Sequence, residues 1–151
     1  MQTRMDIEKI LQDGKSICIK PQGYSMYPVF VPGRDEAVIE PVEVEKLKRG
    51  DVVLYRRGKE WGAEILVMHR IWKVKAEGIY LVGDNQKEIE GPLSSEQIRG
   101  IMTGMNRKGK YISAKNPWYC FCTTIWLWLR PLRPAISKTI AFVKRLLKKY
   151  K

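Results

Sequence analysis

Cysteine and histidine are scarce in this chain of 151 residues. The three cysteines, Cys18, Cys120 and Cys122, form neither a disulfide framework nor a zinc-binding pattern. We interpret them as apolar side chains, which mildly favours a reducing compartment. A single histidine, His69, is the one side chain whose unperturbed pKa lies near neutrality.

Long hydrophobic runs are also absent. The first ten residues are charged throughout, so we expect neither a signal peptide nor an N-terminal membrane anchor. The apolar segment 117–129 has about thirteen residues, whereas a bilayer core needs roughly 20. The length fits one domain with a buried hydrophobic core, with or without an appendage.

Acidic residues are missing from the last third of the chain. Residues 97–151 hold 13 of the 28 lysines and arginines and none of the 16 acids, so they carry the whole net charge of +12. The preceding 96 residues are almost neutral. A neutral body with a basic end predicts an anionic partner, either a membrane surface or a nucleic acid.

The basic end has two parts. Segment 117–129 contains three of the five tryptophans, and 135–151 places apolar residues at helical spacing among lysines and arginines. This pattern predicts an amphipathic tail, residues 117–151, lying peripherally on an anionic membrane. The tryptophans cluster with leucine and isoleucine instead of alternating with basic residues, so nucleic acid is not expected. The other interpretation is a helix packed on the protein's own body.

The body, residues 1–116, is predicted to be mainly β. Short alternating segments separated by turns are typical of a compact, antiparallel, partly closed β fold. Apolar spacing predicts one short helix over 5–13. The expected strands are 16–21, 37–41, 52–56, 63–74, 78–82, 97–105 and 111–113.

Three residues could form a nucleophilic site. Ser25 follows the first strand, between Gly23 and Pro28, where a stiff bend would present its hydroxyl to a cleft. His69 lies in an expected strand, and Asp84 lies in a Gly-Asp-Asn turn. A serine, an imidazole base and an orienting carboxylate are the groups of a hydrolytic triad, although spacing alone does not bring them together.

Four segments in order carry a family resemblance: residues 23–28 (Gly-Tyr-Ser-Met-Tyr-Pro), 49–53 (Arg-Gly-Asp-Val-Val), 69–70 (His-Arg) and 83–85 (Gly-Asp-Asn). Together they resemble the type I signal peptidases, which are membrane-associated serine endopeptidases. Their β-rich fold is shared with the self-cleaving SOS and phage repressors. The resemblance spans roughly residues 14–105.

His69 occupies the position of the general base. In this respect the chain resembles the endoplasmic-reticulum-type branch, which has histidine at that position, whereas most bacterial enzymes have lysine. The resemblance implies Ser25 as nucleophile, His69 as general base and Asp84 as the orienting acid. It also implies cleavage of secreted, membrane or peptide precursors after small residues, with no metal or other cofactor.

This chain departs from the family pattern in three ways. Gly23 replaces a serine whose hydroxyl usually contributes to the oxyanion hole, which would leave backbone N–H groups such as that of Ser25. Glu88 and Glu90 stand where a further aspartate is common, so the acid role could be shared or reassigned. The usual N-terminal membrane span is not seen.

Two other functions are compatible with these residues. One is a self-cleaving regulatory peptidase of the repressor branch, and the other is an inactive membrane-binding module on the same scaffold. A basic interfacial tail favours the cytoplasmic leaflet, whereas the resemblance implies catalysis on the opposite side, and the sequence is compatible with either.

Overall fold

The structure is a computed structural model that describes residues 4–58 and 65–132. Eight strands and two α-helices make up most of this part of the chain. In chain order the elements are α1 (Arg4–Gln12), β1 (Ile17–Ile19), β2 (Asp35–Glu40), the 3₁₀ helix η1 (Val44–Lys46), β3 (Val52–Arg57), β4 (Ile65–Lys75), β5 (Gly78–Val82), β6 (Ile89–Leu93), η3 (Ser95–Gln97), β7 (Ile98–Arg107), β8 (Lys110–Ser113), α2 (Pro117–Trp128) and η4 (Arg130–Leu132).

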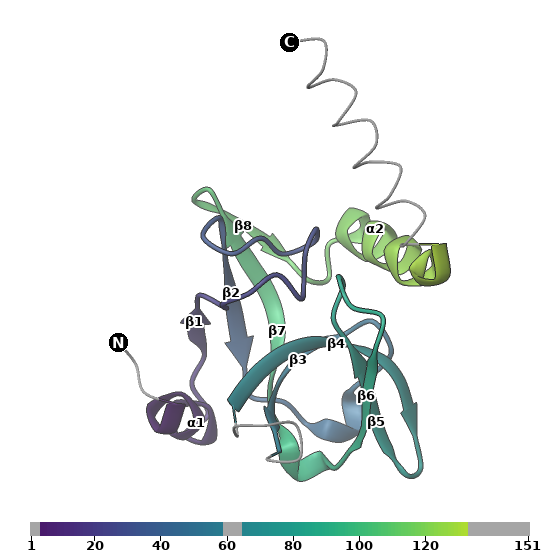
Figure 1. Cartoon of the computed structure of the whole chain (residues 1–151). Coiled ribbons are helices and arrows are strands. Elements are labelled where there is room, and N and C mark those ends of the chain that lie inside the picture. Colours follow the sequence, from purple (N-terminus) through teal and green to yellow (C-terminus); the bar gives the residue numbers. More distant parts are fainter. Residues whose placement is uncertain (1–3, 59–64, 133–151) are drawn as a thin grey trace.

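All eight strands form one antiparallel sheet in the order β1-β2-β7-β3-β4-β5-β6, with β8 paired to β7 (Figure 1). The predicted mainly β, antiparallel class is therefore confirmed. The sheet is not closed, so the predicted partial closure is not confirmed: β1 and β6 lie at the two ends of the strand order, and β8 is a further edge beside β7. The helix predicted over 5–13 and all seven predicted strands are present within a few residues of their expected bounds. Strand β6 was not predicted.

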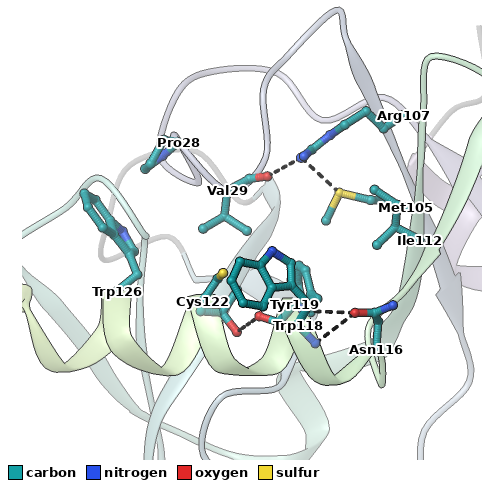
Figure 2. A pocket seen from close by; sticks show the side chains of 11 residues that line it. Pro28, Val29, Met105, Arg107, Ile112, Asn116, Trp118, Tyr119, Cys122 and Trp126 are labelled. Atoms are coloured by element: carbon teal, nitrogen blue, oxygen red, sulfur yellow. Dashed lines mark hydrogen bonds between the residues drawn. The ribbon is translucent and has the colours of Figure 1, made fainter.

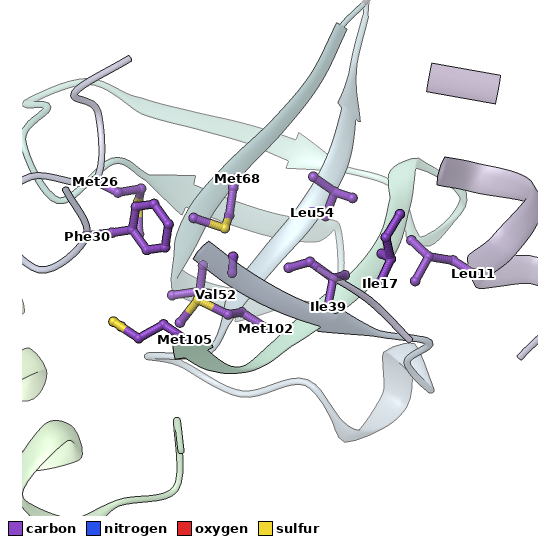
Figure 3. Close-up of a cluster of buried hydrophobic side chains, with 11 residues drawn as sticks. Leu11, Ile17, Met26, Phe30, Ile39, Val52, Leu54, Met68, Met102 and Met105 are labelled. Carbon is purple, nitrogen blue, oxygen red and sulfur yellow. The ribbon is translucent and has the colours of Figure 1, made fainter. Parts of the chain in front are cut away.

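The sheet is buried on both faces around β3. Val52 and Leu54 point into one apolar cluster, which also contains Met26, Phe30 and other side chains drawn in Figure 3. Val53 and Tyr55 point into a second cluster with residues of β4, β5 and β7. This burial on both faces explains why the first four residues of β3, Val52 to Tyr55, are all apolar or aromatic.

Helix α2 packs on the sheet instead of projecting away from it. Its first turn is capped by the Asn116 side chain, which accepts hydrogen bonds from the N–H groups of Trp118 and Tyr119. The indole of Trp126 donates to the Asp84 carbonyl over 2.9 Å. Figure 1 shows α2 beside the loop that joins β5 to β6.

The rest of the predicted tail lies outside the described residues, which end at position 132 before the basic segment 135–151. In the described part of the chain, no helix combines the length and apolar character needed to cross a bilayer.

A buried carboxylate, Asp35, fastens the loop that follows β1 to the sheet. It accepts hydrogen bonds from the guanidinium groups of Arg34 and Arg107 and from the Val31 N–H, all between 2.7 and 3.0 Å. Burial alone would raise the pKa of Asp35, but these donors hold it well below its usual range. Asp35 is therefore ionised at neutral pH.

Replacing Asp35 should destabilise the protein. Asp35→Asn leaves two guanidinium groups without their carboxylate, and we expect the free energy of unfolding to fall by about 2–3 kcal/mol in urea denaturation. The matched control is Glu36→Gln, because the Glu36 carboxylate is partly exposed and contacts the exposed Lys20 and the exposed Cys18 thiol. That change should cost less than about 0.5 kcal/mol. Equal losses in both variants would contradict this role for Asp35.

Candidate active site

Ser25 lies in a loop whose neighbouring side chains are anchored in the core. Strand β1 ends at Ile19, and the buried Met26 and Phe30 then hold the chain against the first apolar cluster. The Phe30 N–H donates to the Met26 carbonyl over 2.9 Å, and the Tyr27 N–H donates to the Tyr24 carbonyl. Ser25 itself is half-buried, so its hydroxyl sits on a braced loop that still opens to solvent.

Gly23 has a backbone reason to be glycine. Its φ is +80°, in the left-handed region that residues with a Cβ avoid at a cost of roughly 1–2 kcal/mol. A serine at position 23, as is usual in the type I signal peptidases that the sequence resembles, would therefore strain the backbone of this loop.

Gly83 allows the Gly-Asp-Asn turn to lie close to the loop that contains Ser25. A Cβ at Gly83 would lie 2.7 Å from the Ser25 carbonyl oxygen. That same oxygen accepts a hydrogen bond from the Asn85 N–H over 2.7 Å. The Gly-Asp-Asn turn therefore lies directly against Ser25, although Gly83 is 58 positions after Ser25 in the sequence.

Ser25 and His69 line the same cavity, which has a volume of about 770 Å³. One wall is formed by residues 19–26, the opposite wall by 65–69 at the start of β4, and Asn85 and Gln86 also contribute. The structure thus brings the predicted nucleophile and base to one space. It shows no hydrogen bond between their side chains, which is common before substrate binds.

His69 is buried and held through one ring nitrogen. Its Nδ1 lies 3.0 Å from the Tyr55 hydroxyl and 3.5 Å from a Glu90 carboxylate oxygen. Tyr55 donates to Glu90 over 2.6 Å, and Arg57 makes two hydrogen bonds to the same carboxylate. The other nitrogen, Nε2, has no hydrogen-bond partner among the described residues.

Asp84 does not make the contact predicted for it. Both of its oxygens accept hydrogen bonds from Arg70, over 2.7 and 2.8 Å, in a fully buried ion pair. No hydrogen bond links Asp84 to His69 among the described interactions. Of the two glutamates considered as substitutes, Glu88 is exposed, whereas Glu90 reaches the histidine. Neither Tyr55 nor Arg57 was recognised from sequence, since neither belongs to the segments that carry the resemblance.

The surroundings keep His69 neutral at pH 7. Burial lowers the pKa of its imidazole to about 4, and Arg57 adds to this effect, whereas Glu90 and Asp84 oppose it. A neutral imidazole with an unpaired nitrogen can accept a proton from a hydroxyl in the same cavity. In the described part of the chain, no group of three or more His, Cys, Asp or Glu side chains could hold a metal ion.

A second cavity, of about 540 Å³, lies between α2, residues 28–29 and strands β7 and β8 (Figure 2). Its polar side chains already serve structural contacts: Arg107 binds Asp35 and the Val29 carbonyl, and Asn116 caps α2. It contains no pair of a nucleophile and a base comparable to Ser25 and His69, so we assign the candidate site to the first cavity.

The depressed pKa of His69 makes stability depend on pH. Between pH 7 and 5 the unfolded histidine, with a pKa near 6.5, binds a proton that the folded one does not. The free energy of unfolding should therefore fall by about 2 kcal/mol as the pH decreases over this range. Chemical denaturation at a series of pH values measures the slope. His69→Gln should flatten the curve, and a flat wild-type curve would contradict a buried neutral histidine.

Comparisons of this chain with models of known protein families, with curated proteins and with solved structures each found no match. The roles of the residues in the cavity are therefore inferred from their positions, contacts and burial.

Proposed function

We propose that the protein is a serine endopeptidase that resembles signal peptidase I in its catalytic fold and cleaves precursors after small residues. The observation that carries this proposal is the shared cavity. It is lined by Ser25 on a braced loop and by a neutral His69 whose Nε2 has no partner among the described residues. The ordered sequence segments support the same activity.

The cavity also suits an extended peptide. Residues 65–69 of β4 pair with β3 on one side, whereas pairing with β5 begins only at Arg70. Among the described strands, none pairs with the other backbone edge of residues 65–69, and these residues line the cavity, so this edge could accept a peptide strand. A precursor bound there would lie with its backbone between the two loops and next to Ser25.

The chemistry follows from these positions. His69 Nε2 takes the proton of Ser25 Oγ as the oxygen attacks the scissile carbonyl carbon, and the backbone N–H of Ser25 stabilises the oxyanion. The C–N bond then breaks, and the leaving amine takes the proton from His69. Water deprotonated by the same histidine hydrolyses the acyl-enzyme ester and restores Ser25. No metal or other cofactor takes part.

The test compares precursor N-termini by mass spectrometry in cells that produce wild type, Ser25→Ala or His69→Ala. One or a few N-termini that follow small residues should be lost in both variants, because each lacks a group needed for attack. The matched control is Ser16→Ala, since Ser16 is exposed and outside the cavity. It should retain every N-terminus.

Identical N-termini in all samples, at equal abundance of folded protein, would contradict proteolysis and favour an inactive membrane-binding module. The self-cleaving alternative has its own signature. Purified wild type stored at alkaline pH would lose intact mass with time, whereas Ser25→Ala would not.

We further propose that α2 places this site at an anionic membrane. Four apolar side chains lie on its outward face at spacings of three and four residues: Trp118, Phe121, Ile125 and Trp128, which are 72%, 57%, 42% and 71% exposed. The opposite face is buried through Thr123 and Leu127. Large exposed aromatic side chains are typical of helices that lie in the interfacial region of a bilayer.

Cationic side chains border this face, as expected for a surface that meets anionic lipid. The guanidinium of Arg49 lies over the rings of Trp72 and Trp128, and that of Arg130 lies over Trp72. The sequence after residue 132 contains basic but no acidic residues, so it adds positive charge shortly after α2 in the sequence. These observations support a peripheral location and leave the side of the membrane open.

Vesicle co-sedimentation tests this surface. The double change Trp118→Ser with Phe121→Ser should weaken binding to anionic phospholipid vesicles by about a hundredfold or more, because burying each large apolar side chain contributes about 1.5–3 kcal/mol. Val74→Ser is the control, because Val74 is exposed near the turn of the β4–β5 hairpin and is not part of α2. Equal binding by the double variant and wild type, or no binding by wild type, would contradict the proposal.

A further inference from the structure

We propose that Tyr55 and Glu90, and not Asp84, position His69 for proton transfer. The inference rests on the proposed function for its kinetic consequences, but the contact itself is defined without any substrate. Tyr55 bridges the imidazole and the carboxylate, so that the orienting group is a phenol backed by a glutamate. This arrangement replaces the direct carboxylate contact expected from the sequence.

The register of the sheet explains why Tyr55 reaches His69. His69 on β4 is opposite Val53 on β3, and Tyr55 is opposite Val67. Tyr55 and His69 are therefore diagonal neighbours on the same face, a separation that an aromatic side chain can span. Their ring centroids lie 5.8 Å apart and their planes are tilted by 49°.

Glu90 reaches the same place because the sheet curls. Its strand, β6, is separated from β3 by β4 and β5 in the order of the sheet. The Glu90 carboxylate nevertheless contacts both Tyr55 and Arg57 of β3. The two hydrogen bonds from Arg57 hold this carboxylate in place, and its burial keeps it from moving toward solvent.

The hydrogen bonds determine which imidazole nitrogen carries the proton. Burial and the nearby Glu90 raise the pKa of Tyr55 far above neutrality, so its phenol keeps its single proton. That proton is donated to Glu90 over 2.6 Å. The phenol oxygen can then only accept from His69, which requires the proton on Nδ1 and leaves a lone pair on Nε2.

This is the tautomer that a general base in this cavity needs. When Nε2 takes the proton of Ser25, the imidazole becomes a cation, and Glu90 is the carboxylate nearest to its Nδ1. The other charged groups near the ring are Arg57, which opposes the cation, and Asp84, which is neutralised by Arg70. Tyr55 and Glu90 thus act as positioning residues: they orient the base without reaching the scissile bond.

The tautomer can be read directly by NMR, because the chain has a single histidine. In a ¹⁵N-labelled full-length sample at pH 7, a long-range ¹H–¹⁵N correlation should show a protonated Nδ1 and a bare Nε2. Tyr55→Phe removes only the hydroxyl, so the two nitrogen shifts should move toward each other as both tautomers become populated. Tyr80→Phe is the matched control, since the Tyr80 hydroxyl donates to the exposed Glu77 and contacts neither His69 nor Glu90 among the described hydrogen bonds. This variant should match wild type.

The kinetic test uses as substrate the precursor that the mass-spectrometry comparison of N-termini identifies. Tyr55→Phe should lower kcat by on the order of a hundredfold, the scale of general-base catalysis, with KM changed by less than about twofold. Glu90→Gln should lower kcat about tenfold, because the imidazolium loses its nearest negative charge. Tyr80→Phe should change neither constant.

A proton on Nε2 in wild type would overturn the proposal, and so would a Tyr55→Phe spectrum identical to that of wild type. An unchanged kcat in Glu90→Gln would show that Glu90 does not help to position His69. The tautomer measurement needs no substrate. If the protein cleaves no precursor, the proposed function is contradicted. The NMR spectrum of His69 would still show whether Tyr55 positions the imidazole.

Discussion

The buried ion pair between Arg70 and Asp84 connects the parts of the molecule that form the cavity. It ties β4 to the turn after β5, and a further Arg70 donor reaches the Gly50 carbonyl before β3. Burying two charges is costly unless each is fully paired, and here both carboxylate oxygens and several guanidinium donors have partners. With Asp84 held, Asn85 lies against the Ser25 carbonyl and Trp126 can dock on the turn. The aspartate of the Gly-Asp-Asn segment therefore contributes to the site by holding backbone in place.

Most of the fold could be predicted because its strands alternate between apolar and polar residues or are continuously apolar. Strand β6 escaped prediction for a clear reason: its residues Ile-Glu-Gly-Pro-Leu offer only two apolar side chains, and a proline within a run argues against a strand. It forms because Leu93 is paired with Ile79 of β5. Helix α2 is apolar on nearly every side, so periodicity could not distinguish its packed face from its exposed one.

The site was predictable only as far as local sequence determines it. Ser25 and His69 stood out because a glycine–proline bend and a lone histidine are visible in the chain itself. The partner of His69 depends on sheet register and on the curl that brings β6 across to β3, and neither property is encoded in a short segment. Asp84 looked suitable because of its turn, but the neighbouring Arg70 binds both of its oxygens. Side-chain direction, and not residue type, separated the glutamate that reaches the histidine from the aspartate that does not.

The hydrogen bond from the Trp126 indole to the Asp84 carbonyl has a thermodynamic consequence. One residue further along, the Asn85 N–H binds the carbonyl of Ser25, so α2 and the serine loop are joined through a single short turn. Whatever shifts α2 relative to the sheet must also shift, or strain, the support of that loop. Coupling of this kind is reciprocal. Under the proposed membrane binding, the free energy by which adsorption of α2 favours one arrangement of the serine loop would equal the free energy by which a peptide in the cavity favours adsorption.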